Sequence, residues 1–307
     1  MSSAQDHQYI FKLWHVRILC LVLAKLHATA KEESRHLGDL GADKYRLKDG
    51  TSVAPWGFRL MLVRVQNGGD SQVGLSRYYS LAREARVESV KALSRKEEGS
   101  DSIYVSAGEW RQRLRMLGLY ISAMLIGMND FNTAIDHLTT LYESASRSNE
   151  KENIEFAKKV APTLALAYLQ TGDTLSAREW FQKIGDEKTK AFTTAVCSMA
   201  DADWSAASSV LEEQLSAAGE ELPESLMVAN NLAISRLHEG ELTKAIALLE
   251  NLVNNGCVTT AVLFNLFTLY DLLQEISAET KVDLLCKIRK GGTVALGSYE
   301  FLRVGLV

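Results

Sequence analysis

Residues 164–181, with the sequence LALAYLQTGDTLSAREWF, decide the fold of this chain. Leu164 and Tyr168 are large and share one helical face, and the pair Gly172-Asp173 divides the stretch into two halves. In the second half a small residue, Ala177, stands four positions before an aromatic residue, Phe181. The pattern predicts two helices joined by a tight turn. Such a unit cannot bury its apolar face alone, so it predicts further helix pairs stacked against it. It also predicts a chain that acts by presenting a binding surface rather than by catalysis.

Three further copies of this pattern lie along the chain. The small anchor residues of all four copies are Ala134, Ala177, Ala207 and Ala245. Their spacings of 43, 30 and 38 residues scatter around the roughly 34 residues of a tetratricopeptide repeat. Each anchor follows a turn segment and precedes a large apolar residue by four positions, namely Leu138, Phe181, Leu211 and Leu249. A weaker fifth copy lies upstream, with Phe58–Val65, Gly68-Gly69-Asp70 and Gly74–Tyr78.

The composition favours helices throughout. The 307 residues include only three prolines, and Val, Ile and Thr rarely alternate with polar residues. We therefore expect an all-α fold, a tetratricopeptide-type helical-hairpin solenoid that forms one continuous domain. Its expected parts are an N-terminal helical segment and loop (1–54), a helical hairpin and connecting loop (55–108), a repeat array with an atypical closing helix pair (109–289) and a C-terminal tail (290–307).

Apolar periodicity predicts the elements before the repeats. Residues 8–30 are expected to form one long amphipathic helix, and residues 38–54 a loop. A helical hairpin is expected over 56–93, followed by a surface connection over 94–102.

Two features mark the second half. Pro162 is expected to end or kink a helix that runs up to Val160. Residues 260–273 and 278–288 are expected to form the closing helix pair. The apolar tail beyond them could pack back on the stack or wait for a partner.

The charge balance argues against a nucleic-acid partner. The formal net charge is −4 and the pI is about 5.9. The chain therefore has no excess of basic residues with which to bind nucleic-acid phosphates. The densest basic cluster, Arg111, Arg113 and Arg115, is interpreted as a solvated helix surface.

No segment predicts a membrane span or a signal peptide. The longest apolar run, Ile18 to Ala24, is far shorter than the roughly 20 residues that a span needs. A cytosolic location is therefore expected. The four cysteines, Cys20, Cys197, Cys257 and Cys286, are far apart and are expected to be buried structural thiols rather than disulfide or zinc partners.

Signatures of catalysis are missing from the sequence. It contains no phosphate-binding loop, no His-Glu-x-x-His zinc pattern and no Gly-x-Ser-x-Gly elbow. The six histidines have no ligand-like spacing. We therefore expect no enzyme activity, no cofactor and no bound metal.

If the function is binding, the first helix of each repeat should line the concave face. Counting back from the anchors places there Leu119, Tyr120, Ala123, Pro162, Thr163, Leu166, Phe192, Thr193, Val196, Asn230, Asn231 and Ile234. Only Asn230 and Asn231 resemble a clamp for an acidic chain terminus, which needs Lys, Arg and Asn. The groove is expected to take an apolar helix or extended segment of another protein, or part of this chain itself. In the alternative interpretation, several of these residues simply pack between repeats.

Segments in the same order across nearly the whole chain are similar to those of a known family. They are Leu13-Trp14 with Arg17, Pro55 with Arg59 and Leu60, Trp110-Arg111 with Arg113 and Leu114, Asp130-Phe131 with Ala134, Gly172-Asp173 with Ala177 and Phe181, Ala229-Asn230-Asn231 with Ala233, and Val262-Leu263-Phe264-Asn265-Leu266 with Thr268–Leu272. The chain resembles the family of the twelfth subunit of the TRAPP vesicle-tethering complex. The Trp-containing helix and the Phe-Asn-Leu segment are its more specific matches.

The resemblance implies a non-catalytic scaffold subunit of a TRAPP III-like complex that acts in ER-to-Golgi transport and autophagy. Its partners would be the other TRAPP subunits, chiefly the large accessory ones, with an indirect link to a Rab1-type GTPase through the core. The chain would be cytoplasmic and peripherally associated with ER-Golgi or Golgi membranes. The alternative is a stand-alone adaptor for an apolar peptide or helix. The candidate partner-binding residues are Trp14, Leu119, Tyr120, Leu166, Phe192, Asn230, Asn231, Ile234 and Phe264.

Overall fold

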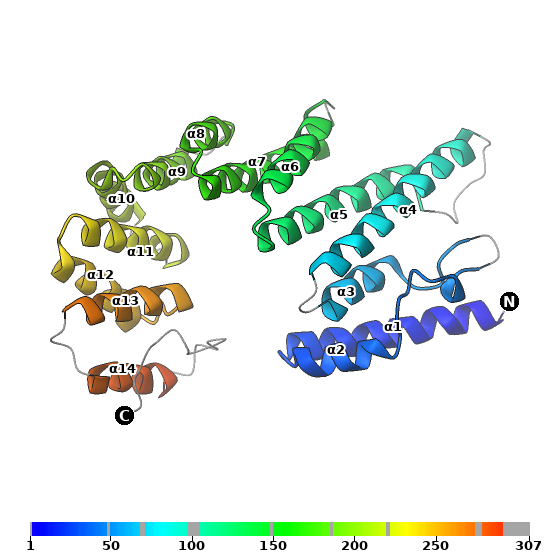
Figure 1. Cartoon of the computed structure of the whole chain (residues 1–307), viewed down its shortest axis with the longest axis horizontal. Coiled ribbons are helices and arrows are strands. Elements are labelled where there is room, and N and C mark those ends of the chain that lie inside the picture. The colour runs from blue at the N-terminus through cyan, green and yellow to red at the C-terminus, as the bar shows by residue number, and fades with distance from the viewer. Residues whose placement is uncertain are drawn as a thin grey trace. The chain divides into compact units, whose positions relative to one another are not determined.

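The computed structural model describes residues 2–47, 50–67, 71–97, 105–147, 150–184, 187–218, 222–273 and 278–290. These residues form α-helices joined by turns, with one short 3₁₀ helix and one isolated β-bridge. The predicted all-α class is therefore confirmed. The chain divides into two compact units, Met1–Ala157 and Lys158–Val307, each with hydrophobic clusters of its own (Figure 1). The prediction of one continuous array over 109–289 stays a prediction.

The first unit carries the predicted N-terminal helices and the hairpin. Its elements are α1 (Ser2–Leu23), α2 (His27–Arg35), the 3₁₀ helix (Asp43–Tyr45), α3 (Trp56–Gln66), α4 (Ser71–Glu97), α5 (Ala107–Gly127) and α6 (Phe131–Ser146), and α7 (Lys151–Thr171) continues into the second unit. The hairpin is therefore α3 and α4. The start of the predicted connection is helical up to Glu97, whereas 98–104 and the turn Gly68-Gly69-Asp70 lie outside the described residues.

The N-terminal helix begins and ends earlier than predicted, at Ser2 and Leu23. Lys25 adopts a left-handed conformation, with φ of 60°, between α1 and α2. Two backbone hydrogen bonds close the turn, from Leu26 N to Leu21 O (2.9 Å) and from Lys25 N to Val22 O (3.0 Å). This is the geometry of a Schellman cap, whose left-handed residue is usually Gly. The prediction of one helix over 8–30 is wrong because a Lys at this position gives no turn signal.

The second unit is a series of helix pairs. After α7 its helices are α8 (Thr174–Gln182), α9 (Glu187–Ala200), α10 (Trp204–Ala218), α11 (Leu222–His238), α12 (Leu242–Asn254), α13 (Thr260–Leu273) and α14 (Ala278–Lys290). The two helices predicted over 260–273 and 278–288 are present as α13 and α14, and their role in closing the array stays a prediction. The predicted tail lies outside the described residues beyond Lys290. All four predicted anchors are fully buried, namely Ala134 of α6, Ala177 of α8, Ala207 of α10 and Ala245 of α12.

The predicted turns inside four helix pairs share one backbone geometry. A residue one or two positions after the first helix has positive φ in each pair, namely Asn129, Gly172, Ala202 and Gly240. The next residue is the N-cap position, and Asp130, Asp173 and Asp203 each accept a hydrogen bond from a backbone N–H three residues on (3.3, 2.9 and 3.1 Å). A left-handed residue followed by Asp therefore explains why the Gly-Asp pair marks the turn.

A substitution at Gly172 should test this turn geometry. We expect Gly172→Ala to lower the free energy of unfolding by about 1 kcal/mol, because the left-handed conformation is unfavourable for residues with a Cβ. The φ of Gly172 is 81°, and an added Cβ would meet no atom within 4 Å, so the cost is conformational. Urea denaturation followed by circular dichroism measures it.

Ala202 provides the matched control, since it occupies the same turn position with φ of 61°. Ala202→Gly relieves the left-handed Ala and should cause no loss of stability. Equal stability of Gly172→Ala and the parent chain would contradict the proposed turn geometry.

Pro162 does not end a helix. It lies inside α7, which runs from Lys151 to Thr171, so a helix end near Val160 is wrong, whereas a kink at Pro162 stays a prediction. Val160 and Leu164 are both fully buried on either side of the proline. Burial of these apolar side chains stabilises the helical path and offsets the lost backbone hydrogen bond.

The cysteines differ from the prediction of buried thiols. Only Cys197 is buried, whereas Cys257 is half-buried and Cys20 and Cys286 are exposed. The exposed cysteines lie on α1 and α14, on faces that no described neighbour covers. Among the described residues, no helix combines the length and the hydropathy that crossing a bilayer would require.

Candidate interaction surfaces

The predicted partner-binding residues fall into two groups. Trp14, Leu119 and Tyr120 belong to the first unit, and the other six belong to the second. In the first unit these side chains are half-buried. Trp14 packs against the cluster around Phe11, and the ring of Tyr120 stacks on that of Tyr78 with centroids 5.9 Å apart. Trp14 and Tyr120 therefore take part in internal packing, and the role of all three residues in binding stays a prediction.

The second unit brings several predicted residues onto one face. Asn265 Nδ2 of α13 donates a hydrogen bond to Asn230 Oδ1 of α11 at 2.9 Å. The two residues are 35 positions apart, which is about one repeat. On α11, Met227 and Ile234 stand three positions before and four after Asn230, and on α13 Leu272 stands seven after Asn265, so they share a face with the asparagine pair. Phe264 directly precedes Asn265 and borders this face. We name the set the α11–α13 face: Met227, Asn230, Ile234, Phe264, Asn265 and Leu272.

The α11–α13 face is apolar around its asparagine pair. Met227, Phe264 and Leu272 are each about half exposed. Ile234 is half-buried. Sequence analysis missed Met227, Asn265 and Leu272, although the three-residue spacing from Asn230 could have indicated Met227. The distance of about one repeat from Asn230 could have indicated Asn265. The face combines exposed apolar side chains with amide groups, which suits a helix or extended segment of another protein.

The other predicted residues of the second unit lie elsewhere. Leu166 is exposed on α7, whereas Phe192 of α9 packs against the cluster of Ala195 and Leu211. Asn231 is half-buried, and its backbone carbonyl accepts a hydrogen bond from Ser235 Oγ at 3.1 Å. The predicted lining residues therefore serve partly as exposed surface and partly as packing between helices.

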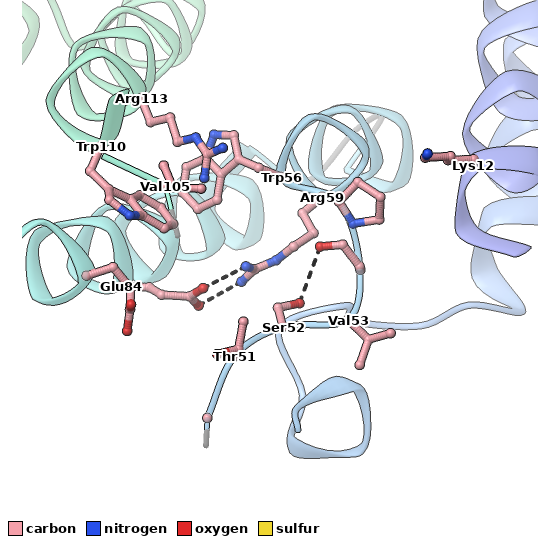
Figure 2. Close-up of a pocket in the computed structure, with 14 residues that line it drawn as sticks. Lys12, Thr51, Ser52, Val53, Trp56, Arg59, Glu84, Val105, Trp110 and Arg113 are labelled. Carbon is pink, nitrogen blue, oxygen red and sulfur yellow. Dashed lines mark hydrogen bonds and ion pairs between the residues drawn. The ribbon is translucent and has the colours of Figure 1, made fainter. Parts of the chain in front are cut away.

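A pocket in the first unit was not predicted. It has a volume of about 340 Å³, and its walls come from α1, the loop before α3, and α3, α4 and α5 (Figure 2). Trp56 and Trp110 meet edge to face, with ring centroids 5.4 Å apart. The guanidinium of Arg113 lies 4.4 Å from the ring centroid of Trp110 and 5.4 Å from that of Trp56. Cation–π attraction and ring packing therefore join α3 to α5.

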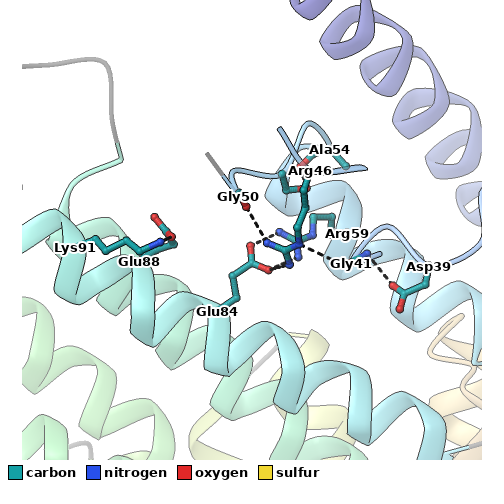
Figure 3. A network of polar contacts seen from close by, with 10 residues as sticks. Asp39, Gly41, Arg46, Gly50, Ala54, Arg59, Glu84, Glu88 and Lys91 are labelled. Carbon is teal, nitrogen blue, oxygen red and sulfur yellow. Dashed lines mark hydrogen bonds and ion pairs between the residues drawn. The ribbon is translucent and has the colours of Figure 1, made fainter. Parts of the chain in front are cut away.

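Two residues that line this pocket, Arg59 and Glu84, belong to an ionic network (Figure 3). Arg59 of α3 binds Glu84 of α4 through two parallel hydrogen bonds of 2.7 Å. Arg46 of the loop donates to the same carboxylate at 2.6 Å and to the carbonyl of Gly50 at 3.0 Å. The Arg59 side chain is only 4% exposed and that of Glu84 16%. The network therefore ties the loop to two helices in a largely buried setting.

The network also changes the protonation of Glu84. Burial by itself would raise the pKa of this carboxyl group. The hydrogen bonds and positive charges of Arg59 and Arg46 outweigh burial and hold the pKa of Glu84 below its ordinary value. Glu84 is therefore ionised at neutral pH, and the carboxylate neutralises the buried guanidinium of Arg59.

One sequence signal could have indicated this pocket. The spacing Trp-x-x-Arg occurs three times in the sequence, at Trp14, Trp56 and Trp110, and the second and third instances, with Arg59 and Arg113, both line the pocket. Residues three apart share a helical face. Because Arg59 and Glu84 are paired with each other within the unit, these contacts of the pocket hold elements together. In the part of the chain that the structure describes, no three His, Cys, Asp or Glu side chains gather in a way that could hold a metal ion.

Comparisons with known proteins support the fold. No protein-family model matches the sequence, and no curated protein matches it. A solved tetratricopeptide repeat protein from Parabacteroides merdae aligns with 96% of this chain and 98% of its own length, at 12% identity and a TM-score of 0.54. A putative kinesin light chain with TPR-like repeats from Podosopora anserina covers 58% of this chain and 93% of its own length, at 18% identity and a TM-score of 0.43.

The alignment with the Parabacteroides merdae protein extends over nearly the whole chain and confirms the predicted tetratricopeptide-type solenoid fold. The chain is thus built as a helical-repeat protein. At this level of identity the likeness concerns the fold alone.

Proposed function

We propose that this chain is a non-catalytic scaffold that binds other proteins, and that it does so through the α11–α13 face. The observation that carries the proposal is the row of half-exposed Met227, Phe264 and Leu272 beside the Asn230–Asn265 hydrogen bond. Apolar side chains around a few fixed polar groups are what a partner helix or strand requires. Stacked repeats provide a rigid support for such a surface.

The finer proposal is a place in a TRAPP III-like vesicle-tethering complex. It is supported by the resemblance of the Trp14 helix and of residues 262–272 to the family of the twelfth TRAPP subunit. In this role the chain contacts the large accessory subunits and supports activation of a Rab1-type GTPase by the core. It would be cytoplasmic and would reach ER-Golgi or Golgi membranes through the complex, in ER-to-Golgi transport and autophagy.

Co-purification tests this proposal. We expect the tagged full chain, recovered from native extract, to bring TRAPP subunits with it, as identified by mass spectrometry. Phe264→Asp should reduce that recovery about tenfold, because it places a charge in an apolar contact. Leu175→Asp is the matched control, since Leu175 is exposed on α8, away from the α11–α13 face.

The second candidate function is a stand-alone adaptor, which the apolar α11–α13 face also supports. Recovery of the chain without TRAPP subunits, but with another protein that Phe264→Asp releases, would favour this adaptor. Recovery as a free monomer with no partner would count against both functions.

A further inference from the structure

Helix α1 has a second apolar face, opposite the one that it buries. Phe11 and Ile18 are buried against a cluster that includes Phe58 of α3. On the other side of the helix, Tyr9, Leu13, Val16 and Leu23 are each more than half exposed, and Cys20 is exposed as well. The helix lies at the edge of the first unit (Figure 1). We name these five exposed residues the α1 seam.

The spacing of the α1 seam is that of a coiled-coil interface. Successive seam residues from Tyr9 to Leu23 are separated by 4, 3, 4 and 3 positions. Apolar residues at this heptad spacing form the row of knobs that fits into the holes of one facing helix. The row is about 21 Å long at 1.5 Å per residue. A helix is therefore the shape that this surface fits.

The charges beside the seam indicate which helix fits. In the heptad frame, Lys12 and Arg17 occupy flanking positions on opposite sides of the seam. Residues 8–25 contain three basic residues and no Asp or Glu. Arg17 is held at the rim by Glu33 of α2, with Nη2 and Oε1 2.6 Å apart. A second copy of α1 would bring only cations to these flanks, whereas acidic flanks would complement Lys12.

We propose that the α1 seam docks an amphipathic helix of another protein, one with apolar residues at heptad spacing and acidic residues on its flanks. This inference rests on the scaffold part of the proposed function and not on the tethering complex. It adds a second docking surface, in the first unit, to the α11–α13 face.

A synthetic probe tests the inference on the full chain. The probe is a fluorescein-labelled peptide of three heptads with Ile at a, Leu at d and Glu at e and g. Its control has Lys in place of Glu at e and g. Fluorescence anisotropy should show that the Glu peptide binds at least about tenfold more tightly than the Lys peptide, and added salt should weaken that binding.

Variants locate the contact. Leu13→Asp and Val16→Asp should each weaken binding of the Glu peptide by about tenfold or more, because they place a carboxylate in the apolar seam. Both sites are exposed, so circular dichroism and thermal melting should match those of the parent chain. Val90→Asp, at an exposed apolar site on α4, should leave binding unchanged.

Several results would overturn the proposal. Equal binding of the two peptides would contradict the preference for acidic flanks. Binding that Leu13→Asp leaves intact would show that the peptide does not bind at the α1 seam. A dimer in sedimentation that Leu13→Asp dissociates would make a second copy the occupant. Binding to phosphatidylserine vesicles that the same variant abolishes would make a lipid surface the occupant. If the peptide binds but co-purification recovers no TRAPP subunits, the α1 seam stands as a docking surface and only the place in the tethering complex is rejected.

Discussion

Replacement of Glu84 by Gln should destabilise the first unit by about 3–5 kcal/mol, the usual cost of leaving a buried ion-pair partner uncompensated. Arg59 is the group left behind, and its side chain is only 4% exposed. Arg46 is more exposed and can turn toward water, so the main penalty falls on Arg59. Urea denaturation followed by circular dichroism measures the loss.

Glu88 offers a matched control on the same helix, one turn further along. It pairs with Lys91 at 2.7 Å, and the Lys91 side chain is 48% exposed. Glu88→Gln should therefore cost less than about 1 kcal/mol, as exposed pairs do. If Glu84→Gln costs no more than Glu88→Gln, the Arg59–Glu84 pair does not stabilise the unit.

A double replacement distinguishes charge from shape. Arg59→Met with Glu84→Leu removes both buried charges and leaves apolar side chains of similar size. This variant should recover most of the stability that Glu84→Gln loses, because apolar replacement of a buried pair is often neutral or stabilising. Failure to recover would indicate that the contacts with Trp56 and the loop matter more than the charge.

The same carboxylate should make stability depend on pH. Because the pKa of Glu84 is below its ordinary value of 4.5 in the folded chain, the unfolded state binds more protons as the pH falls. The stabilisation is therefore complete above pH 4.5 and is lost as the pH falls through the lower folded-state pKa. As the pH is lowered from 6 to 3, roughly the range of carboxyl titration, the urea concentration at the midpoint of unfolding should decrease more steeply for the parent chain than for Glu84→Gln.

Replacement of Ala245 by Leu should lower the free energy of unfolding of the second unit by about 1–3 kcal/mol, the usual range for an overfilled core. Ala245 of α12 is fully buried in one cluster with Ala233 of α11, Leu249 and Leu266. Two facing alanines let the helices of this pair approach closely, and a larger side chain would force them apart. Thermal and urea denaturation measure the change.

Ala247→Leu is the control for Ala245→Leu. Ala247 lies two residues along α12 and is exposed, so the same change adds no buried volume. Leu is nearly as good a helix former as Ala, and the control should change stability by less than about 0.5 kcal/mol. Equal effects at the two positions would contradict the repeat register that the anchors define.

Much of the fold could be predicted because its signals are local. The anchors Ala134, Ala177, Ala207 and Ala245 are all buried as the spacing indicated. The Gly-Asp turn was recognisable because Gly172 supplies a left-handed residue and Asp173 an N-cap within two positions. The break at Lys25 uses the same cap without the Gly, so the local signal was missing and the predicted helix continued past the true end at Leu23.

The candidate surfaces were less predictable. Counting back from the anchors found Asn230 and Ile234, but it also selected Phe192, which packs against a neighbouring helix. A helical face exposes some of its positions and buries others, according to where the next helix lies. The pocket at Trp56 was missed because its residues come from segments far apart in the sequence, and only the repeated Trp-x-x-Arg spacing pointed to it.

The sequence by itself determined the helical class, the repeat anchors and the turns of this protein, since each depends on residues within a few positions of one another. Only the tertiary structure decided that α7 continues through Pro162, that Arg59 and Glu84 form a buried pair, and that Asn265 meets Asn230. These outcomes depend on side chains that are brought together by helix packing. Burial of apolar area and the cost of leaving a polar group unpaired act through those contacts, and neither can be read from local spacing.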